Sequence, residues 1–356
     1  MTDQVEYANW WSKLLFQKAY ERQFVIPVPN PRGLVAFMEY LEARYFTPDL
    51  EALRIDRPVF IVGLPRSGTT VLYNLLCAHK RAAYVTTAVN SFPTAICTME
   101  WARKKFALNI RGERFLQDSI DADFSSPSEP AMFWGKWIGR DTESLYWPEK
   151  RLQDFSPEKR AEIYNDIKRL LHSFGGNGQR FITKYPVLQT ELRMIQDLFP
   201  DAHFIHIIRD GRMVANSLLK LYKLCNDQLK KIQHPTLKTL IPYPRVQNLE
   251  KYVKEFGADD IRTTAHVWQD SIAAVNAVKG ELKHFTEIRY EDILENPFDE
   301  MKRIFKFVDL PWPSDDNALF KREFESVGKV RHTNKYGQFG AVEQIAASTL
   351  KAYRYT

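Results

Sequence analysis

The sequence is poor in features that mark secreted, membrane-spanning or metal-binding proteins. Only three cysteines occur among the 356 residues, and no two of them have CxxC spacing. This excludes a disulfide framework and a cysteine-based zinc site, and it favours a reducing compartment. No apolar run approaches the ~20 residues that cross a bilayer, and the first residues lack the basic and apolar regions of a signal peptide. We therefore expect a soluble, cytoplasmic protein without a transmembrane segment.

A strong charge of either sign is absent as well. The chain has 50 Lys and Arg residues against 44 Asp and Glu residues, a net charge of +6, and no block of consecutive basic residues. This mild excess favours anionic ligands in clefts and gives no reason to expect nucleic acid as a partner. No cluster of His, Asp and Glu with metal-ligand spacing is visible, so we expect no metal.

What the chain does have is an alternation of strand and helix patterns. Strands are expected at 59–62, 181–183, 203–208 and 286–289, and helices at 157–172, 192–199, 213–221 and 298–308. This order predicts an α/β fold, with a central parallel sheet covered by helices on both faces. We see no linker or repeat, so residues 1–356 are expected to form a single P-loop-like, three-layer domain.

Two further segments belong to this predicted domain. Residues 1–55 carry helical patterns, and these helices either pack onto the domain or join a second copy in a homodimer. Residues 90–150 are expected to be irregular and are rich in Trp and Phe. Their rings either line a pocket for the substrate or form a hydrophobic subcore.

The most informative segment follows the first predicted strand. Gly63 and Gly68 have the spacing of a Walker A loop, but Thr69 stands where that motif requires lysine, and the positive charge lies inside the loop at Arg66. Backbone N–H groups at the start of the next helix form a cradle for an anion. The residues expected to hold this phosphate are Arg66, Ser67, Gly68, Thr69 and Thr70. The loop lacks the lysine that reaches the β- and γ-phosphates of a nucleotide.

Further cationic residues follow other strands. Lys184 and Arg209 each come directly after a predicted strand, so they and Arg66 are expected in one crevice at the carboxyl ends of the sheet. Ser217 lies eight residues after Arg209, within the next predicted helix. Arg209 and Ser217 would together bind a second phosphate. The alternative is an ordinary Arg–Asp turn with a surface serine.

With these motifs, the sequence resembles the sulfotransferase family. The Gly-Leu-Pro-Arg-Ser-Gly-Thr-Thr loop is similar to the family's 5′-phosphosulfate loop, and Arg209 with Ser217 matches its 3′-phosphate motif. Phe199-Pro200-Asp201-Ala202 resembles bacterial members, and the Arg-Asp-Gly-Arg run resembles the tyrosylprotein branch. The resemblance, which spans residues 58 to 340, implies 3′-phosphoadenosine 5′-phosphosulfate (PAPS) as the donor.

The resemblance also implies roles for single residues. Tyr290, in an Arg-Tyr-Glu-Asp segment, would lie beside the adenine, unless it is an ordinary core residue. Lys335 and Tyr336 belong to a segment similar to the one that closes over the 3′-phosphate in the family. Sulfuryl transfer requires stabilisation of charge on the leaving phosphate, and Arg66 and Lys184 are the expected catalytic cations.

The general base is the least determined part of the expected mechanism. Many members of the family place a glutamate shortly after the first helix, but residues 84–90 contain no carboxylate. Glu129, in an acidic segment that resembles bacterial members, is our first candidate, and His79 is the second. His79 is otherwise a cap at the end of the phosphate-loop helix. Glu100 and His266 are the remaining candidates.

We therefore expect a PAPS-dependent sulfotransferase that acts on a hydroxyl of a small molecule, lipid or glycan. A P-loop nucleotide kinase or NTPase is the first alternative, although the Walker lysine is missing. The second is a non-catalytic nucleotide- or glycan-binding protein of the same fold.

Overall fold

The computed structural model describes residues 6–10, 12–13, 30–108, 110–113, 121–139, 144–232, 239–328 and 337–355. The chain divides into two compact units. The first consists of Met1–Asp56, Ala83–Gly139 and Pro157–Thr183, and the second of Arg57–Ala82, Arg140–Ser156 and Lys184–Thr356. The expectation of a single domain stays a prediction.

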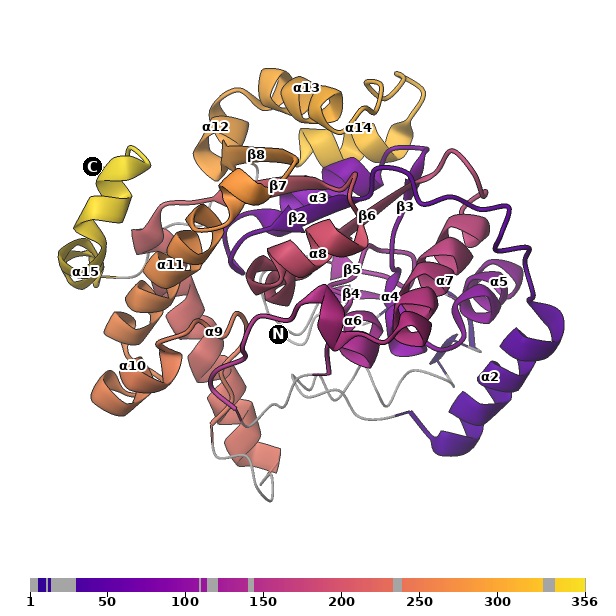
Figure 1. Cartoon of the computed structure of the whole chain (residues 1–356), viewed down its shortest axis with the longest axis horizontal. Helices are drawn as coiled ribbons and strands as arrows, with labels where there is room; N and C mark the ends of the chain where they lie inside the picture. The colour runs from indigo at the N-terminus through magenta and orange to yellow at the C-terminus, as the bar shows by residue number, and fades with distance from the viewer. Residues whose placement is uncertain are drawn as a thin grey trace. The chain divides into compact units, whose positions relative to one another are not determined.

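The central sheet has five strands in the order β3-β6-β2-β7-β8 (Figure 1). The strands are β2 (Val59–Val62), β3 (Ala82–Ala83), β6 (Arg180–Lys184), β7 (His203–Ile208) and β8 (His284–Arg289). β7 runs parallel to both β2 and β8, so that Ile205 pairs with Ile61 on one side and with Thr286 on the other. Every residue of β2 and β7 is buried, as in a parallel sheet covered by helices. The predicted α/β fold is confirmed.

The first group of helices in the second unit includes those that follow β2, β6 and β7. The helices of this group are α3 (Thr69–Cys77), α8 (Leu192–Leu198), α9 (Gly211–Ile232), α10 (Leu249–Phe256), α11 (Ile261–Asn276) and α15 (Phe339–Ala352), with 3-10 turns η1 (Leu152–Asp154), η2 (Pro186–Thr190) and η3 (Lys279–Glu281). α9, α11 and α15 pack together (Figure 1). Their shared core contains Ala215, Ala265 and Val342, and the small side chains allow the helices to approach closely.

The remaining helices of this unit follow β8. They are α12 (Tyr290–Glu295), α13 (Pro297–Phe307) and α14 (Ala318–Glu325). Asn317 caps α14 by accepting a hydrogen bond from the Phe320 N–H, and its amide donates to the Ala78 carbonyl at 2.9 Å. One side chain thus starts α14 and fixes it to the end of α3.

The first unit is mainly helical, with α2 (Arg32–Tyr45), α5 (Ile96–Lys105) and α7 (Pro157–Ser173) side by side (Figure 1). Buried Glu42 of α2 accepts hydrogen bonds from the backbone N–H groups of Cys97 and Thr98, at 3.1 and 2.7 Å. This carboxylate therefore caps α5, whose own sequence supplies no side-chain cap. A small antiparallel sheet consists of β1 (Glu6–Tyr7), β4 (Ile110–Glu113) and β5 (Asp121–Ala122).

The expected strands and helices from residue 157 onward are confirmed, although α9 is longer than expected. The expectation of an irregular 90–150 segment is wrong, because this segment contains α5, α6 (Ala131–Ile138) and the end of α4 (Thr87–Ser91). The rings of Phe133, Trp134 and Trp137 pack edge to face and are buried, so these three aromatics form a subcore.

Candidate functional site

The loop between β2 and α3 has the backbone geometry of an anion cradle. Gly63 and Gly68 have φ of 150° and 88°, and Arg66 has φ of 75°, which is uncommon for a residue other than glycine. Such conformations are costly and cluster at functional sites. Gly68 is the N-cap of α3 and no side chain caps this helix, so first-turn N–H groups remain for a ligand.

Both glycines are required by the close packing of β7 and of the start of α12. A Cβ atom at Gly63 would lie 2.6 Å from the carbonyl oxygen of Ile207, and one at Gly68 would lie 2.1 Å from the ring of Tyr290. The ring of Tyr290, the first residue after β8, therefore lies directly against the loop. Tyr290 is buried, and burial raises the pKa of its hydroxyl.

Arg209, the residue after β7, connects these parts. Its Nη1 donates to the Arg66 carbonyl at 3.0 Å, and its guanidinium lies over the Tyr290 ring at 4.8 Å. Arg66 in turn donates from Nε to Ser217 Oγ of α9 at 2.8 Å. The structure thus brings together Arg66, Gly68, Arg209, Ser217 and Tyr290 from four separate segments of the sequence.

The partners of Arg209 are neutral. Within the described ranges of the chain, its contacts are a carbonyl oxygen and an aromatic ring, and no carboxylate forms an ion pair with it. Burial lowers the pKa of Arg209, although the charges of Tyr290 and Glu291 oppose this shift. A partly buried cation without a counter-ion is costly. An anionic ligand would remove that cost.

Lys184 ends β6 and has a side chain that is 2% exposed. The charge of its ammonium interacts electrostatically with the thiol of Cys77, the last residue of α3. Burial raises the pKa of this thiol well above its usual value, and the charge of Lys184 partly opposes the shift. Lys184 is therefore a buried cation in the same unit as the loop.

The candidates for the base lie in different surroundings. His79 follows α3 and lies about 16 Å from Gly68, given a rise of about 1.5 Å per helical residue. Its Nδ1 accepts from the Arg81 N–H at 3.0 Å, and its ring contacts Phe305. Both contacts lie beyond the C-terminal end of α3, and the role of His79 as second candidate for the general base stays a prediction. Glu129 is partly buried in the first unit.

The two remaining candidates have partners within the protein. Glu100 is buried, accepts from Thr86 Oγ1 at 2.7 Å and forms an ion pair with Arg103. His266 stacks on Tyr252 with ring centroids 4.3 Å apart, and burial lowers its pKa. Lys335 and Tyr336, which were expected at the 3′-phosphate, lie outside the described residues.

A network next to Arg209 was missed by the sequence analysis. Arg212 donates to both carboxylate oxygens of Asp210, to Glu343 at 2.9 Å and to the carbonyl of Tyr355 at 2.7 Å. The Arg-Asp-Gly-Arg run was the only available signal, and it did not separate Arg209 from Arg212. Trp268 is buried and donates from its indole N–H to the Arg209 carbonyl at 3.2 Å.

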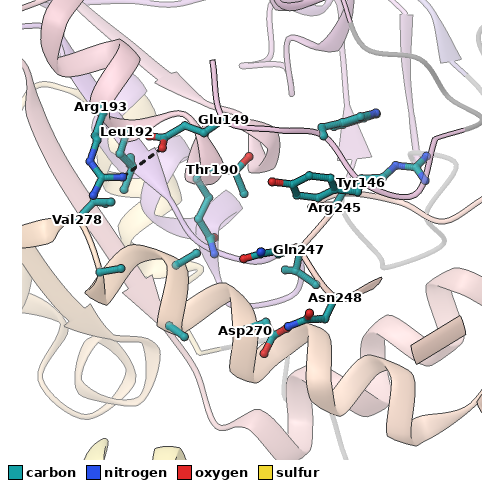
Figure 2. Close-up of a pocket in the computed structure, with 16 residues that line it drawn as sticks. Tyr146, Glu149, Thr190, Leu192, Arg193, Arg245, Gln247, Asn248, Asp270 and Val278 are labelled. Carbon is teal, nitrogen blue, oxygen red and sulfur yellow. Dashed lines mark hydrogen bonds and ion pairs between the residues drawn. The ribbon is translucent and has the colours of Figure 1, made fainter. Parts of the chain in front are cut away.

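A separate cavity of about 410 Å³ lies in the second unit, between η2, α8 and α11 (Figure 2). No residue assigned above to phosphate binding lines it. Its lining carries two cations, Arg193 and Arg245, and two anions, Glu149 and Asp270, and Arg193 donates to Glu149 at 3.1 Å. This pocket therefore presents no excess charge for a phosphate.

The described residues contain neither a metal-ligand cluster nor a helix that could span a membrane. No group of three or more potential metal-ligating His, Cys, Asp or Glu side chains was found among the residues that the structure describes. None of the described helices has the length and apolar character needed to cross a membrane.

Comparison with known proteins gives one consistent result. A family model described as "Sulfotransferase family" matches residues 58–314. The omega-hydroxy-beta-dihydromenaquinone-9 sulfotransferase of Mycobacterium bovis is 24% identical over 275 residues, which cover 73% of this chain and 64% of the relative. Protein-tyrosine sulfotransferase A of Caenorhabditis elegans is 24% identical over 280 residues, which cover 76% of this chain and 53% of the relative.

The fold is shared with a solved structure as well. The sulfotransferase STF9 of Mycobacterium avium superposes with a TM-score of 0.53 at 16% identity, covering 89% of this chain and 81% of the other. The chain spans less than two thirds of the length of the two curated relatives it matches.

Proposed function

The chain belongs to the sulfotransferase family, and we propose that it transfers a sulfuryl group from PAPS to a hydroxyl of a small-molecule, lipid or glycan acceptor. The observation that carries this proposal is Arg209, a partly buried cation whose partners are neutral and which lies against the phosphate loop. A donor with phosphates at both its 5′ and 3′ positions explains why a second cationic site stands beside the first.

The residues present fit this donor. The loop residues Arg66 to Thr70 and the first turn of α3 would hold the 5′-phosphosulfate, because the free backbone N–H groups at the start of a helix point toward a bound anion. Arg209 and Ser217 would hold the 3′-phosphate. Tyr290 would lie beside the adenine, and Lys335 and Tyr336 would add to the 3′-phosphate site.

When bound, PAPS supplies the sulfuryl group and the bisphosphate leaving group. The role of the protein is to position the reactants and to stabilise charge. Arg66 and Lys184 would neutralise the negative charge that develops on the leaving phosphate. Glu129 would accept the proton of the acceptor hydroxyl as general base. Loss of one charge contact is expected to cost about 3 kcal/mol in the transition state, or ~10² in rate.

The class of acceptor is suggested by the relatives. Their names describe a hydroxylated menaquinone in one case and protein tyrosine in the other. Both are hydroxyl compounds, which supports an alcohol or phenol as the acceptor of this chain. We propose that the protein acts in the cytoplasm and that its acceptor site includes part of the 90–150 segment. Homodimer formation through the N-terminal helices remains part of this proposal.

Calorimetric titration with adenosine 3′,5′-bisphosphate, alongside ATP with Mg²⁺, tests the donor site. We expect the bisphosphate to bind with a Kd on the order of micromolar or below, and ATP to bind weakly. Binding of ATP alone would overturn the proposal in favour of a kinase or NTPase. Binding of the bisphosphate without sulfuryl transfer to any alcohol or phenol in a mass-spectrometric screen would leave only a nucleotide-binding protein.

A further inference from the structure

Tyr355 lies at the point where two strand ends of the second unit meet. Its hydroxyl donates to Glu291 Oε2 at 2.9 Å, and its carbonyl accepts from Arg212 Nη2 at 2.7 Å. Glu291 follows β8, and Arg212 lies in the first turn of α9 after β7. The guanidinium of Arg289 lies over the Tyr355 ring at 4.8 Å, and Tyr355 is 7% exposed. These contacts are called the Tyr355 clamp here.

The Tyr355 clamp is connected by hydrogen bonds to the residue that follows Arg209. Glu291 uses its other oxygen to accept from the Asp210 N–H at 3.2 Å, directly after Arg209. Both oxygens of Glu291 therefore have fixed donors, one from the Asp210 backbone and one from Tyr355. The negative charge of Glu291 attracts Arg209, yet the two side chains form no ion pair within the described residues. Arg209 is left facing the loop.

We propose that Tyr355 is a positioning residue for the 3′-phosphate: its hydroxyl holds Glu291 away from Arg209, so that the guanidinium stays available for the ligand. The inference rests on the proposed function. Without the hydroxyl, Glu291 loses one of its two donors and can turn toward Arg209, whose guanidinium its charge already attracts, in competition with Arg289. The guanidinium is then neutralised by a carboxylate before the ligand arrives.

The Tyr355→Phe variant isolates this hydroxyl, because it keeps the ring against Arg289. We expect the Kd for adenosine 3′,5′-bisphosphate to rise by about tenfold, the size of one hydrogen bond to a charged group. The Kd for adenosine 5′-phosphate should stay unchanged, because that ligand does not use Arg209. An equal loss for both ligands, or no loss for either, would overturn the proposal.

The matched control is Tyr353→Phe. Tyr353 lies two residues earlier, and its hydroxyl donates to Asn276 at 3.0 Å and to Glu287 at 3.2 Å, with no contact to Glu291 or Asp210. This variant removes a comparable hydroxyl from the same segment and should leave both affinities as they are. A weakened bisphosphate affinity in Tyr353→Phe would show that any disturbance of this segment has the same effect, which contradicts a specific role of Tyr355.

A second variant separates positioning from loss of structure. In Tyr355→Phe/Glu291→Gln, the carboxylate that competes for Arg209 is neutral, so the bisphosphate affinity should recover toward that of the unmodified protein. A merely structural role predicts a further loss instead. If the unmodified protein itself fails to bind the bisphosphate, the proposed function fails. If it binds but Tyr355→Phe binds equally well, only the role of Tyr355 fails.

Discussion

The two units of the chain treat their buried charges in opposite ways. In the first unit, Glu42 accepts three hydrogen bonds from Cys97 and Thr98, and Glu100 is bonded to Thr86 and Arg103. In the second unit, Arg209 faces a carbonyl oxygen and an aromatic ring. The buried carboxylates Glu42 and Glu100 of the first unit are bonded to donors of the protein, whereas Arg209 of the second unit has only neutral partners among the described residues.

This difference distinguishes structural from ligand-binding charges. A buried charge that is fully bonded within the protein contributes to the fold, and its removal leaves a partner unsatisfied. A partly buried charge with only neutral neighbours costs stability in the free protein, and that cost is recovered when an anion binds. Arg209 and Arg212 show both cases within three residues, since Arg212 is bonded to Asp210, Glu343 and Tyr355.

The largest expected effect is a loss of turnover on substitution of Glu129. As a catalytic carboxylate in the first unit, Glu129 would be an exception to the rule that the charges of this unit serve the fold. If Glu129 is the general base, Glu129→Gln should lower turnover by about 10³-fold, within the range of general-base catalysis. The Kd for adenosine 3′,5′-bisphosphate and the melting temperature should not change, because the substitution is nearly isosteric. The measurement is kcat with a sulfated-product assay, and Glu39→Gln on exposed α2 is the control. Unchanged turnover would remove Glu129 from the mechanism.

The next effect concerns Arg209. Arg209→Met should weaken bisphosphate binding roughly 100-fold, as when one member of a buried charge pair is removed. It should not lower the free energy of unfolding of the free protein, since a cation without a counter-ion is lost. Calorimetry and urea denaturation measure the two quantities. The comparison variant is Arg212→Met, which should lower stability because Asp210 and Glu343 lose their partner. A stability loss in Arg209→Met as large as that in Arg212→Met would contradict the distinction.

Much of this site was predictable from sequence, for a physical reason. Strands buried on both sides read as apolar runs, and the residues after them must gather at one edge of the sheet. Arg66 and Arg209 were found in this way, and the structure places them together. The difference between Arg209 and Arg212 could not be found, because the partners Glu343 and Tyr355 of Arg212 lie 131 and 143 residues further along the chain.

The helices within residues 90–150 were missed for a different reason. α5 and α6 have 10 and 8 residues and neither begins with a side-chain cap. The start of α5 is instead capped by Glu42, 55 residues earlier in the chain. A helix whose cap comes from another helix carries no local start signal. α6 is short and apolar on nearly every side, so its sequence lacks the periodic apolar stripe that predicts a helix. Its aromatic residues were therefore assigned to an irregular segment.

A smaller effect tests the structural role of charges in the first unit. Glu42→Gln keeps the shape of the side chain but replaces one acceptor oxygen by a donor facing N–H groups. We expect the free energy of unfolding to fall by about 2 kcal/mol, the cost of a lost charged hydrogen bond and cap. The Kd of the folded protein for adenosine 3′,5′-bisphosphate should be unchanged. Glu39→Gln on the same helix controls for loss of charge alone. A loss of affinity without a loss of stability would place Glu42 among the ligand-binding charges.

The smallest expected effect is a change in the pH dependence of stability, and it concerns the pair of His206 and Glu287. This pair lies in the second unit, but its groups are bonded within the protein like the carboxylates of the first unit. His206 of β7 lies opposite Glu287 of β8, with Nδ1 3.1 Å from Oε1. Burial lowers the pKa of His206 below its usual value of 6.5, although Glu287 opposes the shift. Burial would raise the pKa of Glu287, but hydrogen bonds from His206 and Lys279 outweigh it and lower this pKa to about 2. Both shifts mean that the unfolded chain binds protons more tightly than the folded one.

Stability is therefore complete above pH 6.5, falls as His206 is forced to protonate below 6.5, and falls further below pH 4.5 as Glu287 does. One group changes the free energy of unfolding by at most about 1.4 kcal/mol per pH unit. Urea midpoints at pH 7.5 and 5.5 should thus differ more for the unmodified protein than for His206→Asn, which cannot titrate but keeps an N–H donor for Glu287. If both proteins lose the same stability over this interval, the imidazole is not held neutral in the folded protein.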